Sequence, residues 1–337
     1  MKSNVLKFVF FYLVISFSLK AQNRLILEAP SVQTSLKTGV LEQIEQYELF
    51  ELNTQALHTF ARNRTKDTFG VRIRFSDTHD WDIILQPAKV HDSDFKFMMS
   101  TGEIVEAEKN ITYEGYLKND QKTKVRMTIS DNYVFGLILD ADRYVFETVN
   151  RTPNRTTNDL VTVYKSNLLV AGSPACGRLP ETQMRENENL NTMPLNSPSS
   201  PTEPLVSNPV SPVVAANLLA STYCVKLGIT LDWQGLAVAG GSVAKFNADL
   251  QTIINVVNGY YAVFNVKYEL NPAYIITASP NPWKDAPGNE SQLTTNFLGW
   301  AFPNLTPKNY NCALLFTGTN MNGISYAYYG QMCPSSS

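Results

Sequence analysis

The chain has 337 residues, of which 44% are hydrophobic and 17% charged, and this composition excludes a chain that is disordered throughout. Its formal net charge of -2 leaves no basic excess to neutralise phosphates, so we do not expect nucleic acid as a partner. The longest apolar segment, residues 8–19, is much shorter than the roughly 20 residues that a membrane-spanning helix needs. We therefore expect no membrane span.

The apolar segment at the N-terminus has the layout of an export signal. Lys2 and Lys7 make its start basic, and Ala21 supplies the small residue at which such signals are cut. Residues 1–21 are therefore predicted to be a signal peptide, rather than a helix of the folded core, and the protein is expected to be secreted to the extracellular space. An even number of cysteines in an oxidising compartment permits three disulfide connectivities, here among Cys176, Cys224, Cys312 and Cys333.

Residues 22–185 are predicted to form a first domain that is mainly β. Residues 47–52 are typical of a strand, and Asn53 or Thr54 can cap a short helix that runs through Leu57 and Phe60. Apolar and polar residues then alternate in short segments separated by turn residues. These segments predict strands at residues 81–85, 111–117, 124–129, 134–139 and 144–149.

Residues 186–217 differ from the rest of the chain, because Pro, Ser and Asn crowd together and the apolar periodicity is lost. This composition predicts a linker between two domains.

Residues 218–337 are predicted to form an α/β domain, so the whole chain combines β-rich and α/β (α+β) parts. The expected order is a strand at 223–231, a helix that begins after Ser242, a strand at 266–270, a helix at 293–301 that stops at Pro303, and strands at 313–316 and 324–329. Such alternation predicts a mixed, mostly parallel sheet with two helices on its faces. The last two strands, joined by a turn at residues 320–323, are expected to be antiparallel.

The sequence contains no complete metal-binding or nucleotide-binding motif. Its histidines, His58, His79 and His91, all precede the linker, and neither HExxH nor CxxC occurs. His79 lies near several aspartates, but carboxylates are common in turns, so we interpret this segment as a turn that leads into the strand at Trp81. The glycines of residues 235–241 lack GxGxxG spacing and are also interpreted as a turn.

Three C-terminal segments resemble the reprolysin (adamalysin) zinc metallopeptidases, which belong to the metzincins, and particularly their secreted bacterial relatives. The segments are residues 223–232, residues 312–318, and residues 323–337 with the phrase Gly-Gln-Met-Cys. In that family this phrase precedes a helix with the motif HExxHxxGxxH, whose histidines bind zinc and whose glutamate activates water. The chain stops in the loop before that helix, so the resemblance implies zinc for the family enzyme but neither zinc ligands nor catalytic residues within this chain.

The first domain resembles the propeptide of the same family, on the order of short phrases at residues 52–57, 111–115 and 144–147. The resemblance implies a cysteine switch at Cys176, in which a thiolate occupies the open position of the zinc ion; an ordinary disulfide or a free thiol is the alternative. It also implies that a peptide or protein substrate adds to an edge strand at Ser325, Tyr326, Ala327 and Tyr328. An activating protease would cut the linker.

The chain departs from the family at two kinds of position. Lys226 and Asn311 stand where family members often carry the acidic residues of a calcium site, which argues against calcium here. The resemblance places Cys224 and Cys312 on neighbouring strands, so we predict a disulfide between them if the strand registers agree. The partner that Cys333 has in the family lies beyond the zinc helix, and Cys333 is expected to be unpaired.

These observations predict a secreted precursor fragment of a zinc metalloendopeptidase, inactive as it stands. Two alternatives remain. The chain is a secreted inhibitor or chaperone of related peptidases that acts through its propeptide, in which case Cys176 is needed for inhibition. In the second alternative, the chain is an adhesive or carbohydrate-binding β-domain protein, and a jelly-roll first domain would favour this alternative.

Overall fold

The structure is a computed structural model that describes residues 24–33, 41, 44–108, 111–131, 133–149, 158–167, 176–177, 222–305, 310–318 and 325–326. The predicted signal peptide and the predicted linker lie outside the described residues. The chain divides into two compact units, Met1–Ala88 with Thr112–Leu168 and Lys89–Ile111 with Leu169–Ser337. No helix among the described residues is long and apolar enough to span a bilayer.

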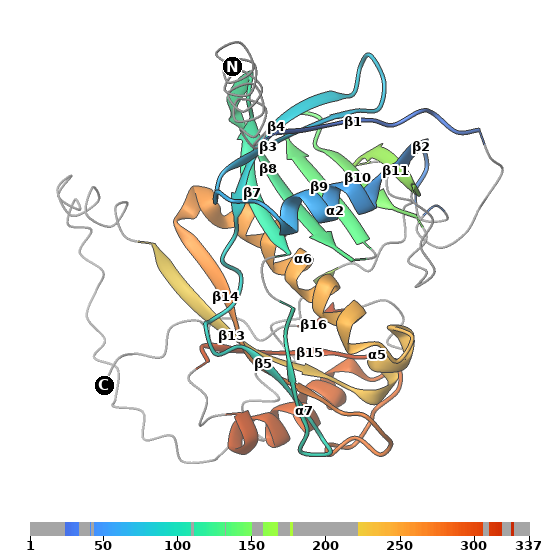
Figure 1. Cartoon of the computed structure of the whole chain (residues 1–337). Helices are drawn as coiled ribbons and strands as arrows, with labels where there is room; N and C mark the ends of the chain where they lie inside the picture. The colour runs from blue at the N-terminus through green and yellow to red at the C-terminus, as the bar shows by residue number, and fades with distance from the viewer. Residues whose placement is uncertain are drawn as a thin grey trace, which may run out of the picture. The chain divides into compact units, whose positions relative to one another are not determined.

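The first unit is built on a nine-stranded mixed sheet, drawn in blue to green in Figure 1. Its elements are β1 (Arg24–Glu28), β2 (Glu48–Leu52), α2 (Thr54–Arg62), β3 (Phe69–Arg74), β4 (Asp80–Pro87), β7 (Thr112–Leu117), β8 (Asp120–Ser130), β9 (Tyr133–Leu139), β10 (Tyr144–Thr148) and β11 (Asp159–Lys165). The strand order is β1-β3-β4-β7-β8-β9-β10-β11-β2. The strands and the helix predicted from the sequence are confirmed, although β8 begins four residues before the predicted strand and β4 ends two residues beyond it. The Asn53 cap is also confirmed, since its side chain accepts a hydrogen bond from the Ala56 amide.

The sheet of the first unit nearly closes on itself, because the chain after β1 bridges to β2. Ser31 forms an antiparallel bridge with Phe50, and the Val32 amide donates to the Leu49 carbonyl at 2.8 Å. From β3 to β11, the strands of this sheet have the same order in space as along the chain, and neighbours pair antiparallel. This meander is not the double Greek key of a jelly roll, so the fold of the first unit does not favour the adhesive alternative.

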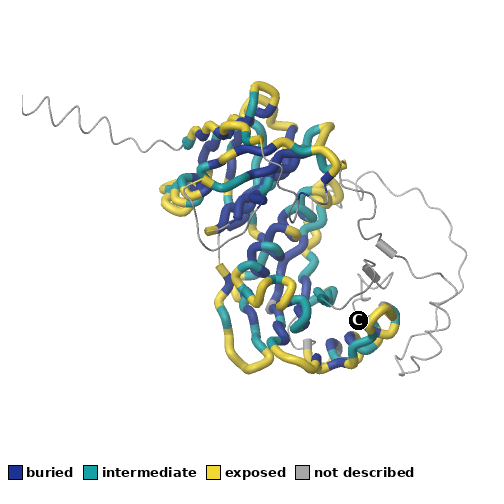
Figure 2. The backbone as a smooth tube through the Cα atoms, turned by 90° about the vertical axis from the view of Figure 1, so that its right-hand side faces the viewer, coloured by how far each residue is buried: buried dark blue, intermediate teal, exposed yellow. Residues whose placement is uncertain are grey.

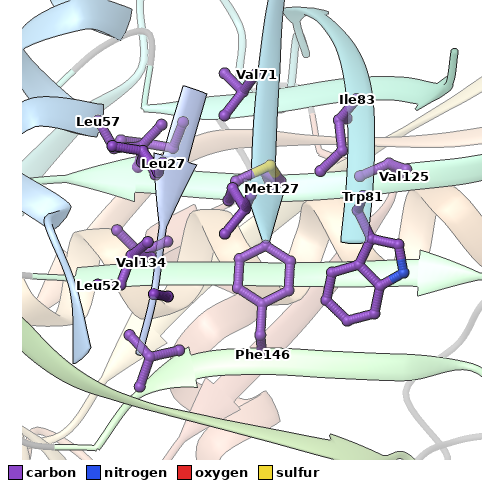
Figure 3. Close-up of a cluster of buried hydrophobic side chains, with 14 of the residues drawn as sticks. Leu27, Leu52, Leu57, Val71, Trp81, Ile83, Val125, Met127, Val134 and Phe146 are labelled. Atoms are coloured by element: carbon purple, nitrogen blue, oxygen red, sulfur yellow. The ribbon is translucent and has the colours of Figure 1, made fainter. Parts of the chain in front are cut away.

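The core of the first unit comes from alternate strand residues on one face of the sheet and from α2. Figure 3 shows Trp81 and Ile83 of β4 beside Met127 of β8 and Phe146 of β10, and each of these side chains is buried. Phe146 lies opposite Gly136 in the β9–β10 register, and a Cβ atom on Gly136 would approach its ring to 2.0 Å. The glycine is therefore needed for this packing.

The second unit has a five-stranded sheet in the order β15-β13-β14-β5-β6. Its elements are β5 (Lys96–Met99), β6 (Ile104–Glu106), β13 (Tyr223–Leu231), α5 (Trp233–Val238), α6 (Val243–Tyr261), η2 (Ala262–Phe264), β14 (Val266–Ile275), α7 (Glu290–Leu305) and β15 (Cys312–Phe316). β15, β13, β14 and β5 are parallel, and β6 is antiparallel to β5. The prediction of a mostly parallel sheet with helical connections is confirmed. In Figure 2 the buried stretches follow the strands and one face of α6.

Two local predictions in this unit differ from the structure. Of residues 235–241, which we expected to be a turn, residues 235–238 belong to helix α5, because Asp232 caps this helix. The turn follows at Gly240 and Gly241, which have positive φ. Pro303 lies inside α7 rather than ending it, and the helix continues to Leu305. Proline removes one hydrogen bond and crowds the preceding turn, which is tolerated here because only the last turn is affected.

The position of residues 89–111, which we call the inserted hairpin, is the main difference from the predicted domains. The sequence places this segment within the first domain, but it contains β5 and β6 and groups with the second unit. Its strands escaped prediction because they are short and are partnered by β14, a strand that is far away in the sequence. Unit 1 is consequently interrupted by part of unit 2.

Candidate functional site

Two segments singled out by the sequence analysis lie side by side in the second unit. β12 (Cys176–Gly177) pairs in parallel with β16 (Ser325–Tyr326), so that Cys176 lies opposite Ser325 and Gly177 opposite Tyr326. We call this two-stranded sheet the edge pair. The candidate switch cysteine is thus brought to the candidate substrate strand, whereas Ala327, Tyr328 and Cys333 lie outside the described residues.

Pairing at this strand has a chemical consequence, because an unpaired strand edge is what an extended peptide would bind. At Ser325 and Tyr326 the backbone is already partnered by the chain's own segment. Among the described residues, β16 belongs to the edge pair and not to the five-stranded sheet, so the antiparallel pairing with β15 that we expected is not observed there.

Asp232 anchors the carboxyl ends of two parallel strands, β13 and β15. Its side chain is fully buried. Oδ1 accepts from the Gly235 amide at 2.6 Å and from the Gly318 amide at 3.0 Å, and Oδ2 accepts from the Thr317 hydroxyl. Asp232 therefore caps α5 and holds the segment that follows β15. The sequence analysis missed this residue, although an aspartate directly after a strand and three residues before the amide that it caps is a capping signal.

A polar network lies next to this anchor. Asn281 Nδ2 donates to Gln234 Oε1 at 3.0 Å and to Asp285 Oδ1 at 2.6 Å, and Gln234 Nε2 donates to Asp285 Oδ2 at 3.1 Å. Among the described residues, buried Asn281 Oδ1 and the indole nitrogens of Trp233 and Trp283 have no hydrogen-bond partner. The network ties α5 to the loop before α7.

Lys226 and Asn311, the residues that the sequence analysis used to argue against calcium, are brought together by β13 and the residue before β15. The Lys226 amide donates to Asn311 Oδ1 at 2.8 Å, and the Asn311 amide donates to the Lys226 carbonyl at 2.8 Å. Lys226 Nζ lies 2.9 Å from Asp92 Oδ2 of the inserted hairpin. The hydrogen bond from Lys226 lowers the pKa of Asp92 to about 2, so both groups are charged at neutral pH.

The predicted disulfide between Cys224 and Cys312 is wrong, because the registers do not agree. Cys312 lies opposite Leu227, three residues beyond Cys224, and both thiols are free. Three residues of strand correspond to about 10 Å, beyond the reach of a disulfide. Burial raises the pKa of Cys312, and burial together with the nearby Glu269 raises the pKa of Cys224. Both sulfurs are thus held in the protonated thiol form.

The described residues contain no group of three or more His, Cys, Asp and Glu side chains arranged to hold a metal ion. His79 is buried against Trp81 and Tyr144 rather than open to a ligand. The aspartates around it each pair with an arginine: Asp77 with Arg74 at 2.7 Å, Asp80 with Arg72 at 2.5 Å, and Asp82 with Arg24 at 2.5 Å. Residues 75–78 form bends between β3 and β4, and the aspartates of this segment are held by ion pairs.

No protein-family model matches the chain, and no curated protein matches it. Among solved structures, the chain is similar to the crystal structure of metalloproteinase-II from Bacteroides fragilis, with 9% sequence identity and a TM-score of 0.34. The alignment covers 82% of this chain and 66% of that one, so this chain spans just under two thirds of its length. The finding is a distant structural resemblance to a bacterial metalloproteinase.

Proposed function

We propose that the chain is a secreted precursor of a zinc-dependent metalloendopeptidase, to which it contributes the propeptide and the front part of the catalytic domain. In this proposal the segment at Cys176 occupies the peptide-binding strand, and a protease that cuts the linker begins activation. Residues 1–21 would direct export.

The observation that carries the proposal is the edge pair. The family resemblance selected Cys176 for a blocking role and Ser325 and Tyr326 for peptide binding, and the backbone pairs these two segments, which are far apart in the sequence. A peptide adds to a strand edge through main-chain hydrogen bonds, so a covalently attached competitor suppresses binding by its high effective concentration.

A zinc ion does not fit the described residues. No suitable cluster occurs among them, and His79, which has several aspartates near it in the sequence, is packed among aromatic rings. The zinc ligands would therefore be residues other than these, and we assign no catalytic step to the described residues.

Two measurements test the proposal. The coding sequence after codon 337 should contain HExxHxxGxxH within a few dozen codons, and a stop codon there without the motif would contradict it. The polypeptide itself, supplied with zinc and an unfolded protein substrate, should show no chelator-sensitive hydrolysis. Such hydrolysis would contradict the proposal that this chain is inactive as it stands.

A second function is that the propeptide region inhibits or chaperones related peptidases in trans, and the edge pair favours it because β12 can add to a similar strand of another chain. Replacing Cys176 with alanine should then abolish inhibition of such a peptidase, whereas Cys224→Ala, at the exposed start of β13, should not. Equal inhibition by both variants would exclude a role for the Cys176 thiol.

A further inference from the structure

We infer that the inserted hairpin, residues 89–111, is a structural part of the second unit, so that cutting the linker leaves the N-terminal piece bound as a second chain. The inference shares only linker cleavage with the proposed function and does not depend on peptidase chemistry. It concerns a surface, the outer edge of β14, and its partner, a strand from the predicted propeptide.

Main-chain hydrogen bonds join the hairpin to β14 over two stretches. The Asp92 amide donates to the Leu270 carbonyl, and the Leu270 amide donates to the Val90 carbonyl, both at 2.9 Å. Further along, Phe97 lies opposite Ala273, and the Ser100 amide donates to the Ile275 carbonyl at 2.8 Å. In the structure Leu270, Ala273 and Ile275 of β14 are fully buried. Without the hairpin, β14 would become an edge strand with unpaired backbone groups.

Apolar side chains of the hairpin complete the core of the second unit. Phe95 and Phe97 are fully buried, and Val90 is 1% exposed. The Phe97 ring meets Phe246 of α6 edge-on at 6.2 Å, and Phe246 in turn meets Phe316 of β15 at 5.8 Å. Removing three such side chains from a core would return their apolar surface to water, which is unfavourable in proportion to the area exposed. The hairpin is thus bound as an interior element would be.

Polar groups on three elements of the second unit fix the position of the hairpin. Lys226 of β13 pairs with Asp92 at 2.9 Å, and Glu269 of β14 pairs with Lys89 at 3.4 Å. Gln251 of α6, which is fully buried, donates from Nε2 to the Glu108 carbonyl at 2.8 Å. Because the Gln251 side chain is buried, its hydrogen bond to the Glu108 carbonyl favours this position of the hairpin over others.

The experiment uses the full secreted chain with a specific protease site placed within residues 186–217. After cleavage of the folded protein, size-exclusion chromatography in native buffer should show the two pieces eluting together. Elution as separate pieces would overturn the inference. A second site between β11 and β12 then detaches the Cys176 segment from the first unit, and the pieces should still elute together; separation only after this second cut would show that β12, not the hairpin, holds them.

Matched variants assign the attachment to named contacts. Asp92→Ala should raise the dissociation constant of the cut pieces about three- to tenfold, and Gln251→Leu about tenfold, because each removes a partner of a fixed polar group. Lys96→Ala is the control, since Lys96 pairs with Glu106 inside the hairpin at 3.2 Å, and it should leave the constant unchanged. No change with either test variant would contradict the role of the hairpin.

Discussion

Asp232 shows how one side chain links elements that are remote in sequence. It lies between β13 and α5, yet it also binds the hydroxyl and the amide of the residues after β15. Gly235 and Gly318 make this approach possible, since a Cβ atom on Gly318 would lie 2.3 Å from the Gln234 carbonyl carbon. The buried carboxylate is tolerated because both its oxygens accept hydrogen bonds.

Replacing Asp232 with alanine should lower the free energy of unfolding of the second unit by about 3 kcal/mol, because three donors lose their acceptor in a buried site. Ser242→Ala is the matched control, because Ser242 caps α6 through one hydrogen bond to the Lys245 amide and should cost about 1 kcal/mol. Urea denaturation followed by tryptophan fluorescence measures both. Equal costs for the two variants would show that Asp232 is merely a helix cap.

Cys224 and Cys312 should react as separate thiols. Cys224 is exposed and Cys312 is half-buried, so iodoacetamide should modify Cys224 first in the folded protein. The rate at each should increase with pH above neutrality, because the raised pKa of each thiol keeps the thiolate scarce. Mass spectrometry of peptides reads the order, with Cys224→Ser as the control that removes the fast site. A disulfide-linked peptide pair would contradict the observed register.

At the scale of elements, α6 shows that a helix can be predicted correctly while its buried face is not. The spacing of Val243, Phe246, Leu250 and Ile253 predicts the helix, and the structure confirms it. However, Ile253 is 43% exposed, whereas Gln251 is fully buried. The buried amides bind backbone groups of other elements, such as Asn258 on Tyr268, and such partners are not visible in a hydrophobic pattern.

The ion pair between Asp92 and Lys226 should make attachment of the inserted hairpin dependent on pH. The pKa of Asp92 is lowered to about 2, so its contribution is present above the ordinary carboxylate pKa and is lost as the pH falls toward 2. The pKa of Lys226 is raised, so its contribution is present below the ordinary value of 10.5 and is lost as the pH rises through the raised value.

Hydrogen exchange of β5 and β14 should therefore be slowest on a plateau between about pH 4 and pH 10, after correction for intrinsic exchange. The faster exchange expected below this plateau, which we call the acid limb, should be absent in Asp92→Asn, because asparagine keeps the shape of the side chain without its charge. An unchanged acid limb in that variant would show that another carboxylate is responsible.

At the scale of the whole molecule, the two units have separate cores, although the chain passes between them more than once. Overpacking one core should therefore leave the other intact. Gly136→Ala places a methyl group against the buried Phe146 ring and should cost the first unit about 1–3 kcal/mol.

Hydrogen exchange read by mass spectrometry locates this effect. Exchange should accelerate in β8, β9 and β10 and remain unchanged in β13 and α6. Gly299→Ala is the control, because a Cβ atom there meets open space on a helix, and it should stabilise α7 by about 0.5–1 kcal/mol. Acceleration in both units by Gly136→Ala would mean that they unfold together.

The sequence by itself determined the elements whose causes are local. Alternation along β4, β8 and β13, the Asn53 and Ser242 caps and the apolar spacing of α6 each act within a few residues, so the pattern alone indicates them. The candidate segments at Cys176 and Ser325 were also chosen from the sequence.

The tertiary structure alone decided which segments meet. It moved residues 89–111 into the second unit, set Cys312 opposite Leu227, and placed Asp232 between two strand ends. The physical reason is that strand pairing and the satisfaction of buried polar groups join residues far apart in the chain, and their register depends on the packing of the whole unit rather than on the neighbours of any one residue.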